Sequence, residues 1–267
     1  MAPVLRFLRA SAIPKSEIPM HVSRITSKSI LTRSRIPGVD YSVNPYVGCQ
    51  HGCRYCYAEF MKKYTGHPEP WGTFVDVKEN APQLLDRQLR KARMGLVTLS
   101  SVCVPYQPVE QAYEITRRCL EVLLRHPFPW SILTKSPLVL RDMDLLTGVE
   151  HSEVGLTVTT DDEDIRRIFE PHAPPIAQRI DALEQLHKHG VKTYAFIGPM
   201  LPMNAERLGS ALIGKVDSVL LDRMNYPSKT ANLYRQHHLE YALRSEYFQS
   251  VRETLKRIFE KHGIDVR

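Results

Sequence analysis

The sequence predicts an α/β fold, a partial (β/α)6 barrel, on three observations. Short β-rich runs alternate with amphipathic helical patterns from about residue 41 to residue 225. Such alternation is typical of a parallel sheet covered by helices, because parallel strands need crossover connections. The pattern contains six strand–helix units, which is too few for a closed eight-fold barrel. We therefore expect an open barrel that binds its ligands at the carboxyl ends of the strands.

Six runs rich in β-branched and aromatic residues predict the strands of this barrel. They lie at residues 42–47, 95–104, 130–135, 153–160, 191–197 and 217–222. Apolar residues recur at helical spacing between these runs and predict covering helices at 80–93, 109–126, 137–147, 179–190 and 205–214. Gly190 is expected to end the fourth helix, because glycine readily adopts the left-handed conformation of a C-terminal stop.

Charge divides the chain into a basic N-terminal extension (1–40), an α/β core whose net charge is near zero (41–225) and a C-terminal helical segment (226–267). Within the last segment, residues 239–262 predict a polar amphipathic helix. The formal net charge of +7 comes from the two ends, where Lys and Arg outnumber the acids by seven to two and by eight to five. Basic ends of this kind fit contact with DNA, and they equally fit solvated tails and a soluble helix face.

The first 16 residues contain Arg6, Arg9 and Lys15 and no acid. This composition faintly resembles an organelle transit peptide, although a ragged basic extension is the preferred interpretation. No run of about 18 apolar residues is present, so the sequence predicts no membrane-spanning helix. Five cysteines, an odd total, and the lack of a secretory signal indicate reduced thiols and a cytoplasmic location.

Three of the five cysteines lie together in the segment NPYVGCQHGCRYCYAEFM. Cys49, Cys53 and Cys56 follow the first predicted strand with the spacing C-x3-C-x2-C. Gly48 and Gly52 are expected to bend this loop so that its thiols converge, since glycine tolerates positive φ. Three thiolates are one too few for the four irons of a cubane iron–sulfur cluster, which would leave one iron open to an exogenous ligand.

Other interpretations of these cysteines remain open. A zinc site could use His51 as its fourth ligand, but no common zinc finger has this spacing, and an exposed loop residue is preferred. A disulfide would need an oxidising compartment. A structural cluster would need a fourth protein ligand, and neither Cys103 nor Cys119 is close in sequence. Cys119 falls at a core-like position of a predicted helix and is interpreted as a packing residue.

The cysteine motif, with Tyr55 before its last cysteine and a six-fold α/β pattern around it, resembles that of the radical S-adenosylmethionine (SAM) superfamily. The resemblance extends over about residues 30–225. It includes segments that look like the spore-photoproduct-lyase-like branch, many of whose members carry a DNA repair photolyase label: VPYQPVE, ILTKS, FEPHAPPIAQRIDAL and PMLP.

This resemblance implies a chemistry as well as a fold. It implies a [4Fe-4S] cluster held by Cys49, Cys53 and Cys56, whose open iron chelates SAM. It further implies reductive cleavage of SAM to a 5′-deoxyadenosyl radical that abstracts a substrate hydrogen. A flavodoxin- or ferredoxin-like protein would supply the electron. No second cysteine cluster is present, so we expect no auxiliary iron–sulfur cluster.

The resemblance also implies residues around SAM. Tyr55 matches an aromatic position near the SAM adenine, and Lys135, at the end of the third strand, would face the SAM carboxylate rather than only solvent. Thr157 and Thr159 would bind the ribose or the amino end of SAM, or would serve only as strand formers. Arg179 would bind or brace the SAM region, or would form a salt bridge on a helix surface.

Two further residues match catalytic positions of the branch. Tyr57 matches one of a tyrosine pair implicated in radical relay, although packing in the core is the preferred interpretation. Cys103 lies near the place where the lyases carry a cysteine that returns a hydrogen atom to the product. A gapless alignment puts that place at Val102, and a slip of one residue along a strand would turn the thiol out of the site. Cys103-Val104 also stands where the branch leads us to expect Thr-Asp.

The prediction is therefore a radical SAM enzyme whose substrate is unassigned. One alternative is DNA lesion repair of the spore-photoproduct-lyase kind, favoured by the basic ends and by Cys103. Another alternative is a non-catalytic iron–sulfur or zinc-binding protein.

Overall fold

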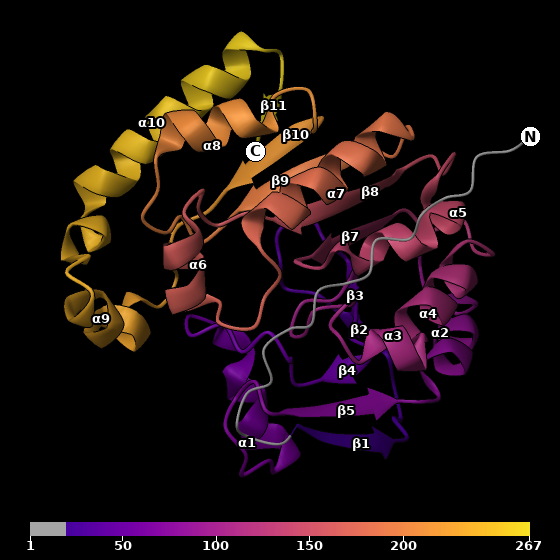
Figure 1. The fold of residues 1–267 in the computed structure, drawn as a ribbon. Coiled ribbons are helices and arrows are strands. Elements are labelled where there is room, and N and C mark those ends of the chain that lie inside the picture. Colours follow the sequence, from indigo (N-terminus) through magenta and orange to yellow (C-terminus); the bar gives the residue numbers. More distant parts are fainter. Residues whose placement is uncertain (1–19) are drawn as a thin grey trace, which may run out of the picture.

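An eight-stranded sheet forms the centre of the computed structural model, which describes residues 20–267 (Figure 1). Arg6, Arg9 and Lys15, and with them the expected transit-like or basic extension, lie outside the described residues. The strand order is β11-β10-β9-β8-β7-β6-β3-β2. The bounds of these strands are β2 Leu31–Arg33, β3 Tyr41–Val43, β6 Val97–Leu99, β7 Trp130–Thr134, β8 Ser152–Thr157, β9 Thr193–Ile197, β10 Ser218–Leu221 and β11 Asp265–Val266.

The six central strands of this sheet are parallel, and spatial neighbours follow one another in chain order from β3 through β6 to β10. At one edge β2 pairs antiparallel with β3, and at the other β11 pairs parallel with β10, so the sheet does not close. This topology confirms the predicted partial (β/α)6 barrel. The carboxyl ends of the parallel strands share one edge of the sheet, and the loops with the candidate residues start there.

Helices follow the central strands as predicted, although several are broken. Their bounds are α2 Ala81–Leu89, α3 Glu110–Tyr113, α4 Ile115–Leu123, α5 Met143–Leu146, α6 Glu163–Phe169, α7 Ile176–Lys188 and α8 Ala205–Leu212. The helix predicted at 109–126 breaks at Glu114, whose φ of 51° is left-handed. The helix predicted at 137–147 starts as the 3-10 helix η2 (Pro137–Asp142). The sequence pattern does not predict α6.

The run 42–47, predicted as one strand, forms two strands in different sheets. β3 ends at Val43, and β4 comprises only Tyr46–Val47. Asn44-Pro45 separates them, because proline has no N–H to donate to a strand ladder.

The run 95–104, also predicted as one strand, pairs only from Val97 to Leu99. Ser100 then takes a φ of 98°, which turns the chain out of the sheet. Cys103 therefore lies in a loop, where the alternation of side chains along a strand does not decide which way its thiol points.

A second sheet of three strands, in the order β1-β5-β4, lies beside the barrel (Figure 1). β5 (Phe74–Lys78) is its centre and pairs parallel with β1 (His21–Ile25) and antiparallel with β4. β4 runs directly into the cysteine loop, which is followed by η1 (Tyr57–Met61) and α1 (Lys62–Thr65). This sheet therefore fixes where the cysteine loop begins. β1 and β2 both come from the segment assigned to the basic extension.

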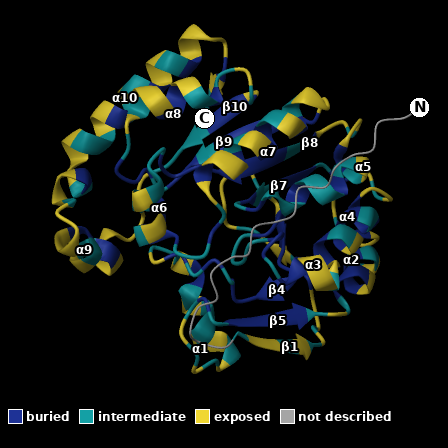
Figure 2. Cartoon of the chain, viewed as in Figure 1, coloured by how far each residue is buried: buried dark blue, intermediate teal, exposed yellow. Residues whose placement is uncertain are grey.

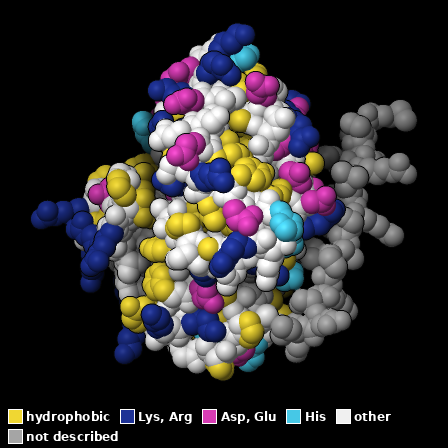
Figure 3. Space-filling model, turned by 90° about the vertical axis from the view of Figure 1, so that its left-hand side faces the viewer, with side chains coloured by type: hydrophobic (Ala, Val, Ile, Leu, Met, Phe, Trp, Pro, Cys, Tyr) yellow, Lys and Arg dark blue, Asp and Glu magenta, His cyan; other side chains and the backbone are white. Residues whose placement is uncertain are grey.

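The chain continues after β10 with α9 (Pro227–Gln236), which the sequence pattern does not predict, and η3 (Glu240–Leu243). α10 (Ser245–Lys261) then packs along α8 (Figure 1). The helix predicted at 239–262 is therefore a turn followed by a helix that starts at Ser245. On the side of the molecule that α10 and α9 form, Lys and Arg are interspersed with Asp and Glu (Figure 3).

The apolar core lies between the main sheet and its helices, where Figure 2 shows buried strands beneath helices with exposed outer faces. Five neighbouring strands each contribute a fully buried side chain: Val43, Leu99, Ile132, Leu156 and Ala195. Burying a side chain the size of leucine stabilises the fold by roughly 1.5–3 kcal/mol. Nowhere in residues 20–267 is there a helix with both the length and the apolar character that crossing a membrane requires.

Candidate functional site

Two glycines shape the cysteine loop, as predicted. Gly48 has a φ of 83°, and a Cβ atom added to it would lie 2.3 Å from the carbonyl oxygen of Phe74 in β5. Gly52 has a φ of 55° and lies against the backbone of Gly72. Any other residue at Gly48 would meet both backbone strain and a steric clash. The loop can pass this close to the second sheet only because these positions carry no side chain.

The thiols of this loop are largely withdrawn from water. Cys49 and Cys53 are 5% and 7% exposed, and Cys56 is half-buried. Burial raises the pKa of all three thiols, that of Cys53 to about 12. Metal coordination replaces such protons, so an all-sulfur donor set of this kind is suited to an iron–sulfur cluster. Within residues 20–267, no three His, Cys, Asp or Glu side chains lie close enough together to hold a single metal ion.

His51 is buried, and the expectation that it is an exposed loop residue is wrong. It is 1% exposed, and neither of its ring nitrogens has a hydrogen-bond partner among the described residues. Burial, together with the charges of Lys135 and Arg179, lowers the pKa of His51 to about 3, so the ring is neutral near pH 7. A buried polar group without a partner is costly. The two nitrogens are therefore available to a polar group from outside the chain, which is consistent with a cluster and SAM.

The centre of the adjoining network is Glu170, a fully buried carboxylate just after α6. Its Oε1 accepts hydrogen bonds from the Tyr55 hydroxyl and, at 3.1 Å, from the Thr159 hydroxyl. Its Oε2 lies 2.5 Å from Nη2 of Arg179, and Nζ of Lys135 lies 3.9 Å from Oε1. One carboxylate thus ties together four residues that the sequence assigns to the SAM region.

Glu170 is ionised although it has no contact with water. Burial alone would raise the pKa of Glu170, but the charges of Arg179 and Lys135 and the hydrogen bond from Tyr55 lower it to about 2. Arg179 is also fully buried and donates to the carbonyl oxygens of Thr157 at 3.0 Å and Pro174 at 2.9 Å. The alternative of a salt bridge on a helix surface is therefore wrong for Arg179, which braces the network from inside.

Lys135 carries the positive charge of this network that no carboxylate neutralises. Glu170 neutralises Arg179, which it contacts more closely, so the two cations together exceed the single carboxylate by one charge. The Lys135 side chain is 11% exposed, and its ammonium lies 5.7 Å from the centre of the Tyr55 ring. The alternative of a merely solvated lysine is wrong. This position suits the binding of an anionic group beside the cysteine loop.

The two threonines differ in their use of polar atoms. Both are buried, but the hydroxyl of Thr159 is engaged with Glu170, whereas Thr157 contributes its carbonyl oxygen to Arg179. β8 ends at Thr157, so Thr159 lies beyond the strand that was predicted to carry both. The assignment of either hydroxyl to SAM remains a prediction.

Tyr57 and Cys103 both contact the segment Ser100-Ser101. Tyr57 is 44% exposed, so the preferred interpretation of core packing is wrong, and its hydroxyl donates to the carbonyl of Ser101. The Cys103 sulfur lies 3.3 Å from the Ser100 hydroxyl and is half-buried. Burial, followed by the charges of Cys56 and Cys103, raises the pKa of Tyr57 to about 12. Their catalytic roles remain predictions.

Cys119 is fully buried in α4, which confirms it as a packing residue. Two residues that sequence analysis does not single out complete the site. Glu170 is part of the quoted segment FEPHAPP, but no spacing rule marks a single acid as the partner of an arginine nine residues later. Asn44 holds the loop before Cys103, since its Oδ1 accepts from the backbone N–H groups of Ser101 and Val102 at 2.8 and 2.9 Å.

The family model described as the radical SAM superfamily matches residues 43–212, from the end of β3 to the end of α8. The chain belongs to the radical SAM superfamily. This radical SAM segment includes the cysteine loop, the Glu170 network and the loop with Cys103. The family confirms the predicted superfamily and, with it, SAM-dependent radical chemistry in general terms.

The chain is also similar to two uncharacterized proteins in sequence and to a solved structure in fold. An uncharacterized protein of Methanocaldococcus jannaschii is 41% identical over 183 residues, which are 68% of this chain and 69% of that protein. An uncharacterized protein of Acidianus two-tailed virus is 30% identical over 176 residues, 62% of this chain and 58% of that protein. The fold is similar to that of spore photoproduct lyase complexed with dinucleoside spore photoproduct, with a TM-score of 0.67, 12% identity and coverage of 92% of this chain and 81% of that one.

Proposed function

We propose that this radical SAM protein is a cytoplasmic enzyme that holds a [4Fe-4S] cluster on Cys49, Cys53 and Cys56 and binds SAM at the open iron. When bound, the cluster and SAM supply the chemistry: one electron, from a flavodoxin- or ferredoxin-like donor, cleaves SAM to methionine and a 5′-deoxyadenosyl radical. The observation that supports this most strongly is the adjacency of the cysteine loop to the Glu170 network, since the charge of Lys135 acts on the thiols of both Cys53 and Cys56. That network offers one cation, Lys135, to an anionic ligand.

The chain's own residues would bind and orient the cofactors. Lys135 would pair with the SAM carboxylate, and Tyr55, held by Glu170 through its hydroxyl, would present its ring to the adenine. Arg179 and Glu170 are positioning residues, because both are fully buried. Glu170 contacts Tyr55 and Lys135, and Arg179 holds Glu170 in place. The buried walls would also keep water away from the reacting atoms.

The test of this function is anaerobic reconstitution followed by reduction with dithionite and addition of SAM. We expect about four irons per chain, as one cubane requires, and 5′-deoxyadenosine as a product that chromatography can quantify. A parallel reaction without dithionite should give none. Iron well above this value would contradict the absence of an auxiliary cluster. An intact cluster that binds SAM without cleaving it, with or without candidate substrates, would favour the non-catalytic alternative.

A second candidate is repair of a DNA lesion, and two observations favour it: the fold similarity to spore photoproduct lyase and the hydrogen bond that joins Tyr57 to Ser101, two residues before Cys103. Fold alone does not carry a reaction from one protein to another. The same reconstituted protein, given dinucleoside spore photoproduct, should release the repaired dinucleoside if this candidate is correct. If 5′-deoxyadenosine formed without repair, the enzyme would act on a different substrate.

Replacing Lys135 by glutamine should weaken SAM binding while the cluster still assembles. A charge-assisted contact in a buried site contributes roughly 1.5–3 kcal/mol, so we expect the Kd for SAM to rise about 10- to 100-fold. Equilibrium dialysis of labelled SAM against the reconstituted protein would measure this. The matched control is Lys188→Gln on the exposed face of α7, which should leave the Kd unchanged. An unaltered Kd in Lys135→Gln would remove Lys135 from the SAM site.

A further inference from the structure

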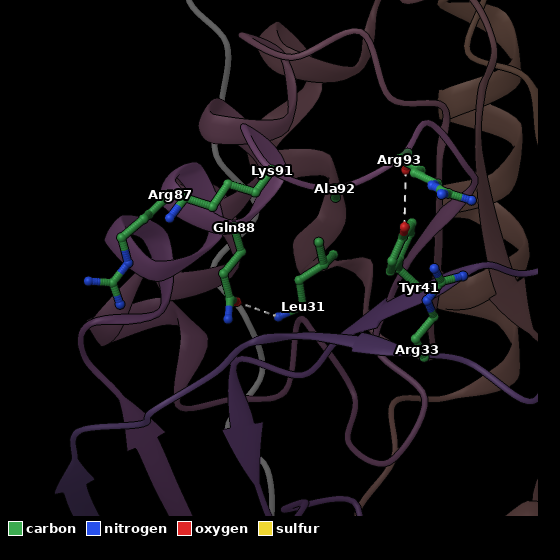
Figure 4. Close-up of a pocket in the computed structure, with 8 residues that line it drawn as sticks. All are labelled: Leu31, Arg33, Tyr41, Arg87, Gln88, Lys91, Ala92 and Arg93. Carbon is green, nitrogen blue, oxygen red and sulfur yellow. Dashed lines mark hydrogen bonds between the residues drawn. The ribbon is translucent and has the colours of Figure 1, made fainter.

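A basic hollow of about 460 Å³ lies at the opposite end of the barrel from the cysteine loop. It is formed by β2, the end of α2 and the loop that precedes β6, beside Tyr41 at the start of β3 (Figure 4). Arg33, Tyr41 and the loop before β6 are at the amino ends of the parallel strands, whereas β4 and the cysteine loop follow the carboxyl end of β3. The hollow is therefore separate from the proposed SAM site.

Four cations line this hollow, and no acid does: Arg33, Arg87, Lys91 and Arg93. None of the four forms an ion pair with an acidic side chain of residues 20–267. Two acids, Asp86 and Asp40, are adjacent in sequence to residues that line the hollow. Asp86 pairs with Arg90 at 2.6 Å and contacts His126 at 2.9 Å, and Asp40 accepts from the backbone N–H of Leu96. The hollow thus carries an excess of positive charge even when the carboxylate of Asp40 is counted.

The frame that holds these cations is ordered by hydrogen bonds. Oε1 of Gln88 accepts from the backbone N–H groups of Ile30 and Leu31 at 3.0 and 2.9 Å, which ties α2 to the start of β2. The Tyr41 hydroxyl donates to the carbonyl of Arg93 at 3.1 Å, and the Arg33 guanidinium lies 5.2 Å from the centre of the Tyr41 ring. The backbone around the hollow is therefore fixed before any ligand binds.

The cations form two groups rather than one. Figure 4 shows Arg87 and Lys91 on one side of the hollow and Arg33 and Arg93 on the other, with an uncharged floor between them. A site for one small anion would have its cations gathered around a single point. Two separated groups of cations instead match a ligand that carries phosphates at intervals, and the planar guanidinium fork is well suited to phosphate oxygens.

We propose that this hollow binds the phosphate backbone of a nucleic-acid strand. The separation of the cation groups and the concave surface favour a strand over a flat anionic membrane. Arg and Lys that contact phosphates give affinity without base specificity, and each contact adds to the salt dependence of binding. The site would hold a nucleic acid at the end of the barrel remote from the cysteine loop, so it is independent of whether the radical chemistry acts on that nucleic acid.

The test is fluorescence anisotropy of a labelled single-stranded oligonucleotide with the full chain over a series of salt concentrations. The variant Arg87→Gln/Lys91→Gln should bind about tenfold or more weakly, and the slope of log K against log salt should fall by about two, one for each lost phosphate contact. Neither side chain makes a hydrogen bond within the described residues, so the fold should not change. Circular dichroism and the Tm would verify this.

The matched control is Arg257→Gln/Lys261→Gln, which removes the same charge from exposed positions near the end of α10. Equal weakening by both double variants, or by neither, would overturn the proposal, because net charge or the N-terminal segment would then account for binding. Displacement of the oligonucleotide by ATP at equal phosphate concentration would assign the hollow to free nucleotides instead. Binding to anionic vesicles that the hollow variant alone abolishes, without an effect on the oligonucleotide, would assign it to a membrane surface.

Discussion

Cys53→Ala is expected to abolish iron binding at the cysteine loop and 5′-deoxyadenosine formation together. Cys53 is the middle thiol of the motif and is 7% exposed, so no solvent ligand could easily replace it. With two thiolates left, two of the four irons would have no protein ligand, and the cubane would be labile. The measurement is iron content and the visible absorbance of the cluster after anaerobic reconstitution, followed by product formation with SAM and dithionite. We expect both to fall to background.

Cys119→Ala is the matched control, because Cys119 is also a buried cysteine but lies in α4. It should keep full iron content and full product formation. It should lose only the packing of one small side chain, which lowers the free energy of unfolding by about 1 kcal/mol. If Cys53→Ala retained wild-type iron, the cluster assignment would be wrong. If both variants lost iron, the cause would be a damaged fold.

Glu170→Gln is expected to cause a large loss of stability. The substitution removes the charge that Arg179 faces at 2.5 Å, in a place where both side chains are fully buried. Breaking a buried pair by neutralising one partner leaves an uncompensated charge, which costs about 3–5 kcal/mol. Urea unfolding of the metal-free protein would measure this. The surface pair of Lys256 and Glu260 supplies the control, since Glu260→Gln should cost well under 1 kcal/mol.

A double variant separates the lost charge from lost packing. Glu170→Gln/Arg179→Met removes both charges and should be more stable than Glu170→Gln alone, because no unpaired charge is left inside. A double variant that is less stable than the single one would mean that the Glu170–Arg179 interaction is not the source of the effect.

The pH dependence of stability provides a second measure of the same carboxylate. The folded-state pKa of Glu170 is about 2, below its ordinary value of 4.5, so the unfolded chain takes up this proton first as the pH falls. The stability that Glu170 contributes is therefore fully present above about pH 4.5 and is lost as the pH falls toward 2. Glu170→Gln should show a shallower loss of stability across this window than the wild type.

The fold could be predicted from the sequence because its signals are local. The alternation of β-rich runs and amphipathic helices gave the parallel order of the main sheet, and the glycines beside Cys49 and Cys53 have the positive φ that the tight loop requires. The errors arose where a single residue ends an element. Pro45 divides one predicted strand, and the backbone turn at Ser100 shortens another, and neither position interrupts the apolar pattern.

The candidate site was less accessible to sequence reasoning, because its connections are long-range. Tyr55 and Glu170 are 115 residues apart in the chain, and no periodicity joins them. His51 is polar and lies among glycines, so composition places it in solvent, whereas the folded chain covers it completely. The second sheet escaped prediction for a related reason, since β1 pairs with β5 across about 50 residues.

The order in which the ribosome delivers the chain bears on when the site can receive iron. The three thiols emerge before β5, although Gly48 packs against Phe74 of β5 in the folded chain. The buried wall beside the thiols requires Glu170 and Arg179, which emerge more than a hundred residues later. A nascent chain therefore exposes its cysteines long before it can shelter them. Stable loading of iron would have to wait until the chain has been made at least as far as Arg179.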